Sequence, residues 1–199
     1  MSGIPRAVLD TDVIFSRVLH ELFGRLAAEA RLMDLLWSDE LLDEARRVLV
    51  ERKPLTRGVA DRWVGYLREA FPAGVVDLAA AELTVDPAEL TTDPDDAHVC
   101  ALALAGNADV LLTFDRGYLR EALDAHGVEV ADPDTYLCAQ LDTEPDAVLD
   151  ALAAQRATWG DGERTMDELL DAFGRARTSD FAQRVRDMLT SSPSGHGLR

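Results

Sequence analysis

Cysteine is scarce in this chain. The 199 residues include only Cys100 and Cys138, which show no metal-ligand spacing and lie in apolar helical contexts. Because a free cysteine behaves as a small hydrophobe, we expect both thiols to be buried and reduced. A zinc site is not expected, since no histidine pairs with acids or cysteines at metal-binding spacing. This cysteine usage favours a cytoplasmic protein.

Long apolar runs are also absent. No stretch approaches the about 18 consecutive apolar residues that a membrane-spanning helix requires. An apolar strand is expected almost at once after the N-terminus, which leaves no room for a leader of signal-peptide length. With 47% apolar residues the chain can still bury a sizeable core. We therefore expect an intracellular protein without a membrane segment, built as one domain with an appendage.

Basic residues are few relative to acidic ones. Lys and Arg number 20 against 37 Asp and Glu, so the formal net charge is -17. This balance argues against a general coat protein of nucleic acid, since phosphate binding is driven by basic surface and counterion release. A chain of this charge that acted on nucleic acid would need a metal ion and a local basic patch, or a basic partner. Most of the acids are expected to form a solvated face.

Four short acidic motifs stand in segments that should order their backbone. They read Val8-Leu9-Asp10-Thr11-Asp12, Leu42-Asp43-Glu44, Pro94-Asp95-Asp96-Ala97-His98 and Thr113-Phe114-Asp115. Carboxylates are costly to bring together, so a fold that gathers several of them needs a cation. Mg²⁺ and Mn²⁺ prefer oxygen ligands. The motifs therefore predict a site for one of these divalent metals.

The rest of the pattern alternates short apolar runs with helical periods. Strands are expected at residues 6–9, 32–37, 75–78, 108–113 and 128–130. Helices are expected at 11–30, 39–50, 57–71, 96–105, 116–125 and 133–141. The alternation predicts an α/β fold with a mostly parallel sheet and helices on both sides. Ligands of such sheets bind at the carboxyl ends of the strands, which is where Asp10 and Asp115 are expected.

The limits of one helix can be read from single residues. Ser38 is expected to cap the helix at 39–50, and Pro54 is expected to stop it.

In their order the acidic motifs resemble those of the PIN-domain nucleases, and within them the toxin ribonucleases of bacterial VapBC toxin–antitoxin pairs. The likeness rests on Asp10-Thr11-Asp12 after the first strand and on residues 38–44, 95–99 and 108–115. It covers residues 4 to about 137. The resemblance implies a PIN-like three-layer α/β/α fold and a Mg²⁺- or Mn²⁺-dependent endoribonuclease. It also implies an RNA substrate, a cognate antitoxin and a homodimer.

The resemblance also assigns roles within the site. Four acids are implied to bind the metal and position the nucleophilic water: Asp10, Glu44, Asp96 and Asp115. Thr113 should share a face with Asp115. Its hydroxyl would bond a metal-bound water or a ligand carboxylate, or else satisfy a backbone group at the strand end. Many relatives carry Asn in place of Asp12, so Asp12 either ligates the metal or orients its neighbours.

Each acid also has a structural interpretation. Asp10 could cap a helix, Asp115 could cap one that begins at Arg116, and Glu44 could simply face solvent.

In the third motif Asp93 and Asp95 compete with Asp96, and we assign Asp95 as the helix cap. His98 follows Asp96 by two helical positions, so it should face away from that carboxylate and be structural.

Basic residues cluster in one segment of the chain, and a further one, Arg116, directly follows the fourth motif. The basic residues of that segment are Arg46, Arg47, Arg52, Lys53, Arg57, Arg62 and Arg68. They are either a rim that guides phosphates or an ordinary solvated helix with salt bridges.

The C-terminal third has a different character. Apolar residues at helical spacing predict helices at 145–155, 166–175 and 181–189, with no catalytic motif among them. We divide the chain into a nuclease domain at 1–142, a helical extension at 143–190 and a disordered tail at 191–199. The extension resembles that of a long subgroup of VapC-like proteins. It either packs on the domain or contacts an antitoxin or a second copy.

Two other classes of function remain open. Asp10 and Asp12 after a strand would be nucleophile and acid in a haloacid-dehalogenase-type phosphohydrolase, although Ile14 stands where that family has Thr. A PIN-like protein-binding module without catalysis is the other. Retention of all four acids speaks against it.

Overall fold

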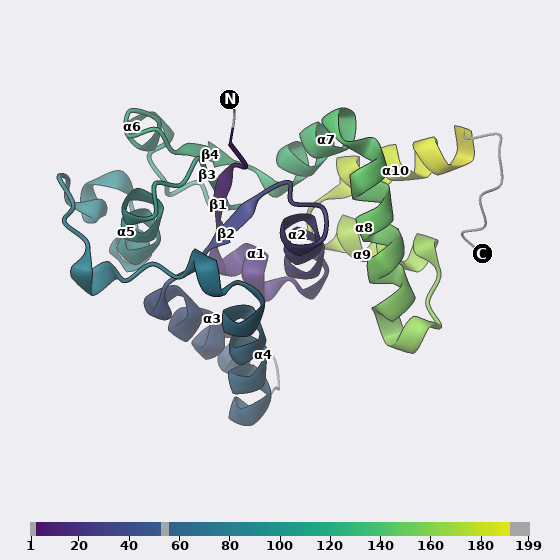
Figure 1. The fold of residues 1–199 in the computed structure, drawn as a ribbon, viewed down its shortest axis with the longest axis horizontal. Coiled ribbons are helices and arrows are strands. Elements are labelled where there is room, and N and C mark those ends of the chain that lie inside the picture. The colour runs from purple at the N-terminus through teal and green to yellow at the C-terminus, as the bar shows by residue number, and fades with distance from the viewer. Residues whose placement is uncertain (1–2, 53–55, 192–199) are drawn as a thin grey trace. The chain divides into compact units, whose positions relative to one another are not determined.

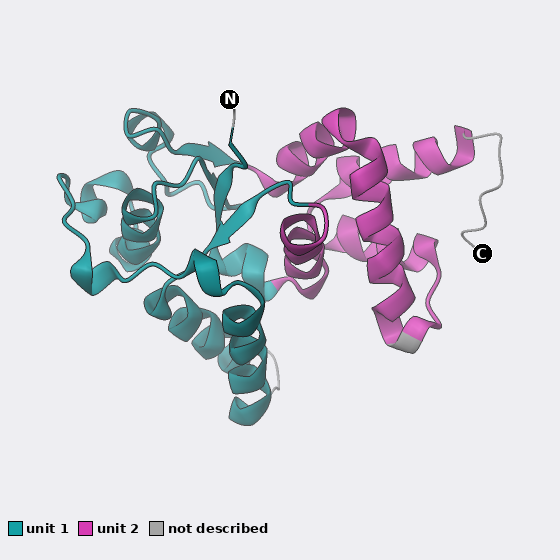
Figure 2. Cartoon of the chain, viewed as in Figure 1, with its two compact units in different colours: residues 1–15, 31–131 teal, residues 16–30, 132–199 magenta. Residues whose placement is uncertain are grey.

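The computed structural model describes residues 3–52 and 56–191. By their contacts the residues form two compact units, shown in Figure 2. Unit 1 comprises residues 1–15 and 31–131, and unit 2 comprises residues 16–30 and 132–199. The chain therefore leaves unit 1 after residue 15, returns to it at residue 31, and leaves it again after residue 131.

Unit 1 is built on a four-stranded sheet in the order β2-β1-β3-β4 (Figure 1). The strands are β1 (Arg6–Leu9), β2 (Asp34–Leu36), β3 (Val110–Leu112) and β4 (Glu129–Ala131). All three pairings are parallel. Every residue of β3 is buried, as expected for a strand covered on both faces. The predicted parallel sheet is thus confirmed.

Helices surround this sheet. They are α1 (Thr11–Phe15), α3 (Asp39–Arg52), α4 (Arg57–Ala70), α5 (Ala97–Ala105) and α6 (Arg120–Asp124). Four 3₁₀ turns complete the unit: η1 (Pro72–Gly74), η2 (Leu78–Ala80), η3 (Pro87–Leu90) and η4 (Pro94–Asp96). The Ser38 hydroxyl accepts a hydrogen bond from the Leu41 amide at 3.3 Å, which confirms the predicted start of α3. Pro54, predicted to end this helix, lies outside the described residues.

Three sequence predictions about elements are wrong. The helix expected at 11–30 is interrupted, because Ser16 has an extended conformation with φ -80° and ψ 103°. The strand expected at 75–78 reduces to one bridge between Val75 and Trp37, followed by η2. The helix expected from Arg116 begins only at Arg120, because residues before it pair with another segment.

Unit 2 consists of helices. They are α2 (Arg17–Ala28), α7 (Pro133–Thr143), α8 (Pro145–Thr158), α9 (Met166–Arg175) and α10 (Ser179–Ser191), with the 3₁₀ turn η5 (Trp159–Gly162). The fully buried Gln155 of α8 donates to the Val18 carbonyl of α2 at 3.0 Å. Phe173 and Phe181 join α9 to α10, with their rings edge to face and 5.5 Å apart. A buried polar contact thus joins α2 to α8, and an aromatic contact joins α9 to α10.

The predicted boundary at residue 142 lies within unit 2. Helices α2 and α7 share this unit with the three helices expected in the extension. The separation of a nuclease part from an appendage stays a prediction. Of the predicted tail, Ser191 is the last residue of α10, and residues 192–199 lie outside the described part of the chain.

The remaining expectations concern cysteines and membrane segments. Cys100 and Cys138 are both free thiols; Cys100 is buried, whereas Cys138 is only partly so. None of the helices in the described residues is long and apolar enough to cross a membrane.

Candidate active site

The first and fourth acidic motifs meet at the carboxyl ends of two paired strands. Leu9 of β1 pairs with Leu112 of β3, and the Asp10 amide donates to the Leu112 carbonyl at 3.0 Å. The fully buried Thr113 hydroxyl donates to Asp10 Oδ2 at 2.6 Å, while the Thr11 amide donates to Asp10 Oδ1 at 2.7 Å. Asp10 therefore has a protein donor on each carboxylate oxygen, in a site where only 6% of the residue is exposed.

Asp12 ties the same two strand ends together. Its Oδ2 accepts a hydrogen bond from the Phe114 amide at 3.2 Å. Asp12 thus holds the backbone between Thr113 and Asp115. This contact fits the interpretation in which Asp12 orients its neighbours.

Asp115 follows β3 and turns the chain sharply. Its amide donates to Thr113 Oγ1 at 2.9 Å, and its Oδ1 accepts from the Gly117 amide at 2.6 Å. A Cβ atom on Gly117 would lie 3.1 Å from Thr92 Oγ1 and 3.2 Å from Asp115 Oδ1, so this turn favours glycine. Asp115 stabilises a turn here and does not cap a helix at Arg116.

A short antiparallel contact links this turn to the third motif. The Thr92 amide donates to the Gly117 carbonyl at 2.9 Å, and the Leu119 amide donates to the Leu90 carbonyl at 2.9 Å. Thr91 and Tyr118 form the bridge between these two hydrogen bonds. Residues 90–92, which lead toward Asp96, are thereby fixed beside the residues that follow Asp115.

The third motif places Asp96 before the first turn of α5. Asp95 is not the expected N-cap of α5: that position is Asp96 itself, and Asp93 caps the preceding turn η4, where its Oδ1 accepts from the Asp95 amide at 3.0 Å. Asp96 makes no side-chain cap hydrogen bond to α5. Burial and the nearby carboxylates, Asp10 foremost among them, raise the pKa of Asp96 to about 7. The carboxyl group of Asp96 therefore lies close to several other acidic side chains.

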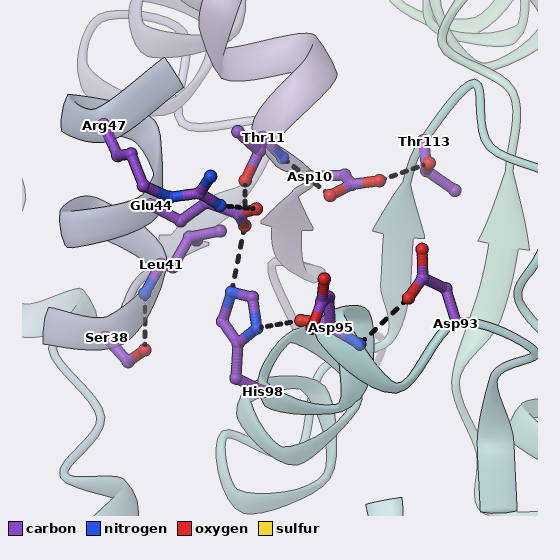
Figure 3. A network of polar contacts seen from close by, with 10 residues as sticks. All are labelled: Asp10, Thr11, Ser38, Leu41, Glu44, Arg47, Asp93, Asp95, His98 and Thr113. Carbon is purple, nitrogen blue, oxygen red and sulfur yellow. Dashed lines mark hydrogen bonds and ion pairs between the residues drawn. The ribbon is translucent and has the colours of Figure 1, made fainter. Parts of the chain in front are cut away.

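Glu44 of α3 reaches the same region and is held by three side chains, shown in Figure 3. Its Oε2 accepts from the Thr11 hydroxyl at 2.8 Å and lies 3.2 Å from His98 Nε2. Its Oε1 lies 3.3 Å from a guanidinium nitrogen of Arg47. The Glu44 side chain is only 19% exposed, so the interpretation that it merely faces solvent is wrong. The contact with His98 lowers the pKa of Glu44, against the effect of burial.

Burial dominates the electrostatics of the deepest groups. It raises the pKa of Asp10, although the hydrogen bonds from Thr113 and Thr11 partly offset the effect. Burial, followed by the negative charges of Asp10 and Asp96, also raises the pKa of Tyr118. Burial would lower the pKa of His98, but its contacts with Glu44 and the Asp95 carbonyl raise it. Burial therefore disfavours the charged forms of Asp10 and Asp96, in spite of the hydrogen bonds that Asp10 accepts.

The donor set suits a hard divalent cation, because the groups that gather here are carboxylate and hydroxyl oxygens. In residues 3–52 and 56–191, however, no three His, Cys, Asp or Glu side chains stand in an arrangement that could hold a metal ion. The oxygens of Asp10, Glu44 and Asp115 instead accept hydrogen bonds from the protein.

Sequence reasoning missed the contacts that Thr11 and His98 make with Glu44. It judged His98 against Asp96 on the same helix, whereas the partner of His98 is Glu44 on another helix. Only the tertiary structure reveals this contact.

Several basic residues of the 46–68 segment form ion pairs within the chain. Arg46 contacts Asp43 at 2.9 Å, and Arg68 contacts Asp39 at 2.6 Å. These two fit the interpretation of a solvated helix with salt bridges.

Comparison with protein families agrees with the fold. Residues 6–117 match the PIN domain, and residues 133–187 match the VapC50 C-terminal domain. The chain belongs to the PIN-domain family, since this match covers more than half of its length. The second match confirms the resemblance to VapC-like proteins with a C-terminal extension. Neither the curated proteins nor the solved structures contain a match.

Proposed function

We propose that this protein is a Mg²⁺- or Mn²⁺-dependent endoribonuclease and the toxin of a toxin–antitoxin pair. The observation that carries the proposal is that Asp10, Glu44 and Asp115, from three separate segments, lie close enough to Asp96 to add to the effect of its burial, and together these effects raise its pKa to about 7. Crowding of carboxylates costs stability, and such groups gather mainly at functional sites. PIN domains are generally nucleases, so a cation site for phosphodiester hydrolysis accounts for it.

The four carboxylates would hold the cation, and the threonines would hold the carboxylates. A bound divalent cation supplies an activated water and charge stabilisation at the phosphate. Thr113 and the Thr11 amide fix Asp10, while the Thr11 hydroxyl fixes Glu44. Asp12 keeps the backbone before Asp115 in place. Asp96, whose pKa is about 7, would release its proton when it binds the cation.

The partners follow from the family and the charge. The match to the VapC50 C-terminal domain supports an antitoxin partner and an RNA substrate. A net charge of -17 would attract a basic inhibitory segment. We also propose a homodimer, as the resemblance to VapC-like toxins implies. Membership in the PIN family separates the chain from the haloacid-dehalogenase phosphohydrolases.

The test is cleavage of RNA by the purified protein with Mg²⁺, with Mn²⁺ and with neither metal. We expect wild-type cleavage that EDTA abolishes, and a loss of at least about 100-fold in Asp10→Asn, which removes one charge without changing shape. Asp124→Asn, at an exposed position of α6, is the matched control and should cleave as wild type does. Wild-type protein that is folded but cleaves no RNA with either metal would favour the non-catalytic binding module.

A further inference from the structure

The imidazole ring of His98 connects two of the acidic segments. Its Nδ1 lies 2.8 Å from the Asp95 carbonyl oxygen, and its Nε2 lies 3.2 Å from Glu44 Oε2 (Figure 3). Both neighbours are acceptors, so each ring nitrogen faces a group to which it can donate. Among the described residues Nε2 has no well-aligned hydrogen-bond acceptor, and its approach to Glu44 is an ion pair when the ring is protonated. The ring thus spans from the start of α5 to α3.

The contacts of Glu44 differ in how firmly they hold it. The Arg47 side chain is 59% exposed, and exposed ion pairs contribute little. The side chains of His98 and Glu44 are 21% and 19% exposed. Both His98 and the Thr11 hydroxyl approach the same oxygen, Oε2. These two sheltered groups therefore set where the flexible Glu44 side chain points.

We propose that His98 of α5 is a positioning residue that fixes Glu44 of α3 relative to Asp96, the residue just before α5. His98 and Asp96 are two residues apart, so a contact from His98 to Glu44 sets the separation of two acids from different segments. The inference rests on the proposed function, because it takes Glu44 as part of the cation site. It gives His98 a role that neither the acidic motifs nor its own helix indicates.

Two substitutions separate the two contacts of the ring. In His98→Asn the amide nitrogen stands near the place of Nδ1, so the contact with Asp95 is kept and that with Glu44 is lost. In His98→Gln the longer side chain carries its amide nitrogen near the place of Nε2, so the contact with Glu44 is kept. We expect His98→Asn to weaken Mn²⁺ binding by about 10- to 100-fold, and His98→Gln to restore most of it.

The measurement is calorimetric titration of the metal-free protein with Mn²⁺, accompanied by kcat and KM for RNA cleavage and by urea unfolding. Glu44→Gln alone should also weaken Mn²⁺ binding. If His98 acts through Glu44, adding His98→Asn to Glu44→Gln should change the affinity less than about 3-fold further.

Equal losses in His98→Asn and His98→Gln, or effects of His98→Asn and Glu44→Gln that multiply, would overturn the positioning role alone. Loss of unfolding free energy with unchanged Mn²⁺ affinity would also overturn it, because the role would then be structural. Wild-type protein that bound no Mn²⁺ would refute the proposed function and this role together.

Discussion

The hydroxyl of Thr113 offers a sharp test of how the acidic site is supported. Thr113 is fully buried and donates to Asp10 Oδ2 at 2.6 Å, while it accepts from the Asp115 amide at 2.9 Å. Thr113→Val keeps the shape of the side chain and removes both hydrogen bonds. Thr113→Ser keeps the hydroxyl and removes only a methyl group, so it is the matched control.

The size of the effect follows from the two partners that lose a contact. A hydrogen bond to a charged group contributes about 1.5–3 kcal/mol, and an unsatisfied buried amide costs about 1–3 kcal/mol. Because the Asp115 amide is only partly buried, water can replace part of its loss. We expect Thr113→Val to lower the free energy of unfolding by about 2–4 kcal/mol. It should also raise the pKa of Asp10 further, since the bond from Thr113 now lowers it.

The assay is thermal and urea unfolding in EDTA at pH 8, followed by circular dichroism. For a chain of this size each kcal/mol shifts Tm by about 2–4 °C. Thr113→Ser should cost about 1 kcal/mol, as expected for a lost methyl group. If Thr113→Val proves as stable as Thr113→Ser, the hydroxyl does not support Asp10, and the carboxylate must be held by its other contacts.

Three further predictions concern charge, the C-terminal helices and the partner. In EDTA, Asp96→Asn should raise the free energy of unfolding at pH 8 by about 1–2 kcal/mol after allowance for solvent screening. Because the folded pKa of Asp96 is about 7, above its ordinary value of 3.8, wild-type stability should fall as pH rises between these values. The gain should therefore shrink as pH falls below 7 and vanish near pH 3.8, and a gain that persists there would contradict burial and repulsion of the Asp96 charge as its cause. A chain ending at Asp142 should aggregate, because the truncation exposes the surface of α2 that packs on α8. A monomeric, folded product would show that α2 stays soluble without α8. If a cognate antitoxin exists, stopped-flow association should slow strongly with added salt, and flat rates would exclude electrostatic steering.

The parts of the fold set by local pattern were predictable from sequence. The runs that form β1 and β3 are mostly apolar, with Asp10 directly after β1 and Asp115 three residues after β3, and Ser38 caps α3 as its position indicates. The break at Ser16 was not predictable, because buried apolar residues keep helical spacing across it, from Ile14 to Val18. Hydrophobic periodicity indicates which residues are buried, but it does not indicate that one helix ends and another begins between them.

The candidate site shows the same division. The positions of Asp10 and Thr113 follow from two strands that end side by side. The late start of α6 does not follow from the local sequence pattern, because Tyr118 pairs with Thr91, a residue far from it in sequence. The environment of Glu44 likewise depends on Thr11 and His98, each from a different segment. Contacts of this kind leave no periodic signal in the chain.

The membership of α2 in unit 2 has a consequence for synthesis on the ribosome. Helix α2 ends at Ala28, whereas its partners begin with α7 at Pro133. At about 5–20 residues per second, the roughly 100 intervening residues take on the order of 5–20 s to make. By the end of that interval all four acidic motifs have been translated, so the nascent chain carries the complete set of acids while the apolar face of α2 still lacks its helical partners. Nascent chains are therefore expected to need protection from a chaperone before release.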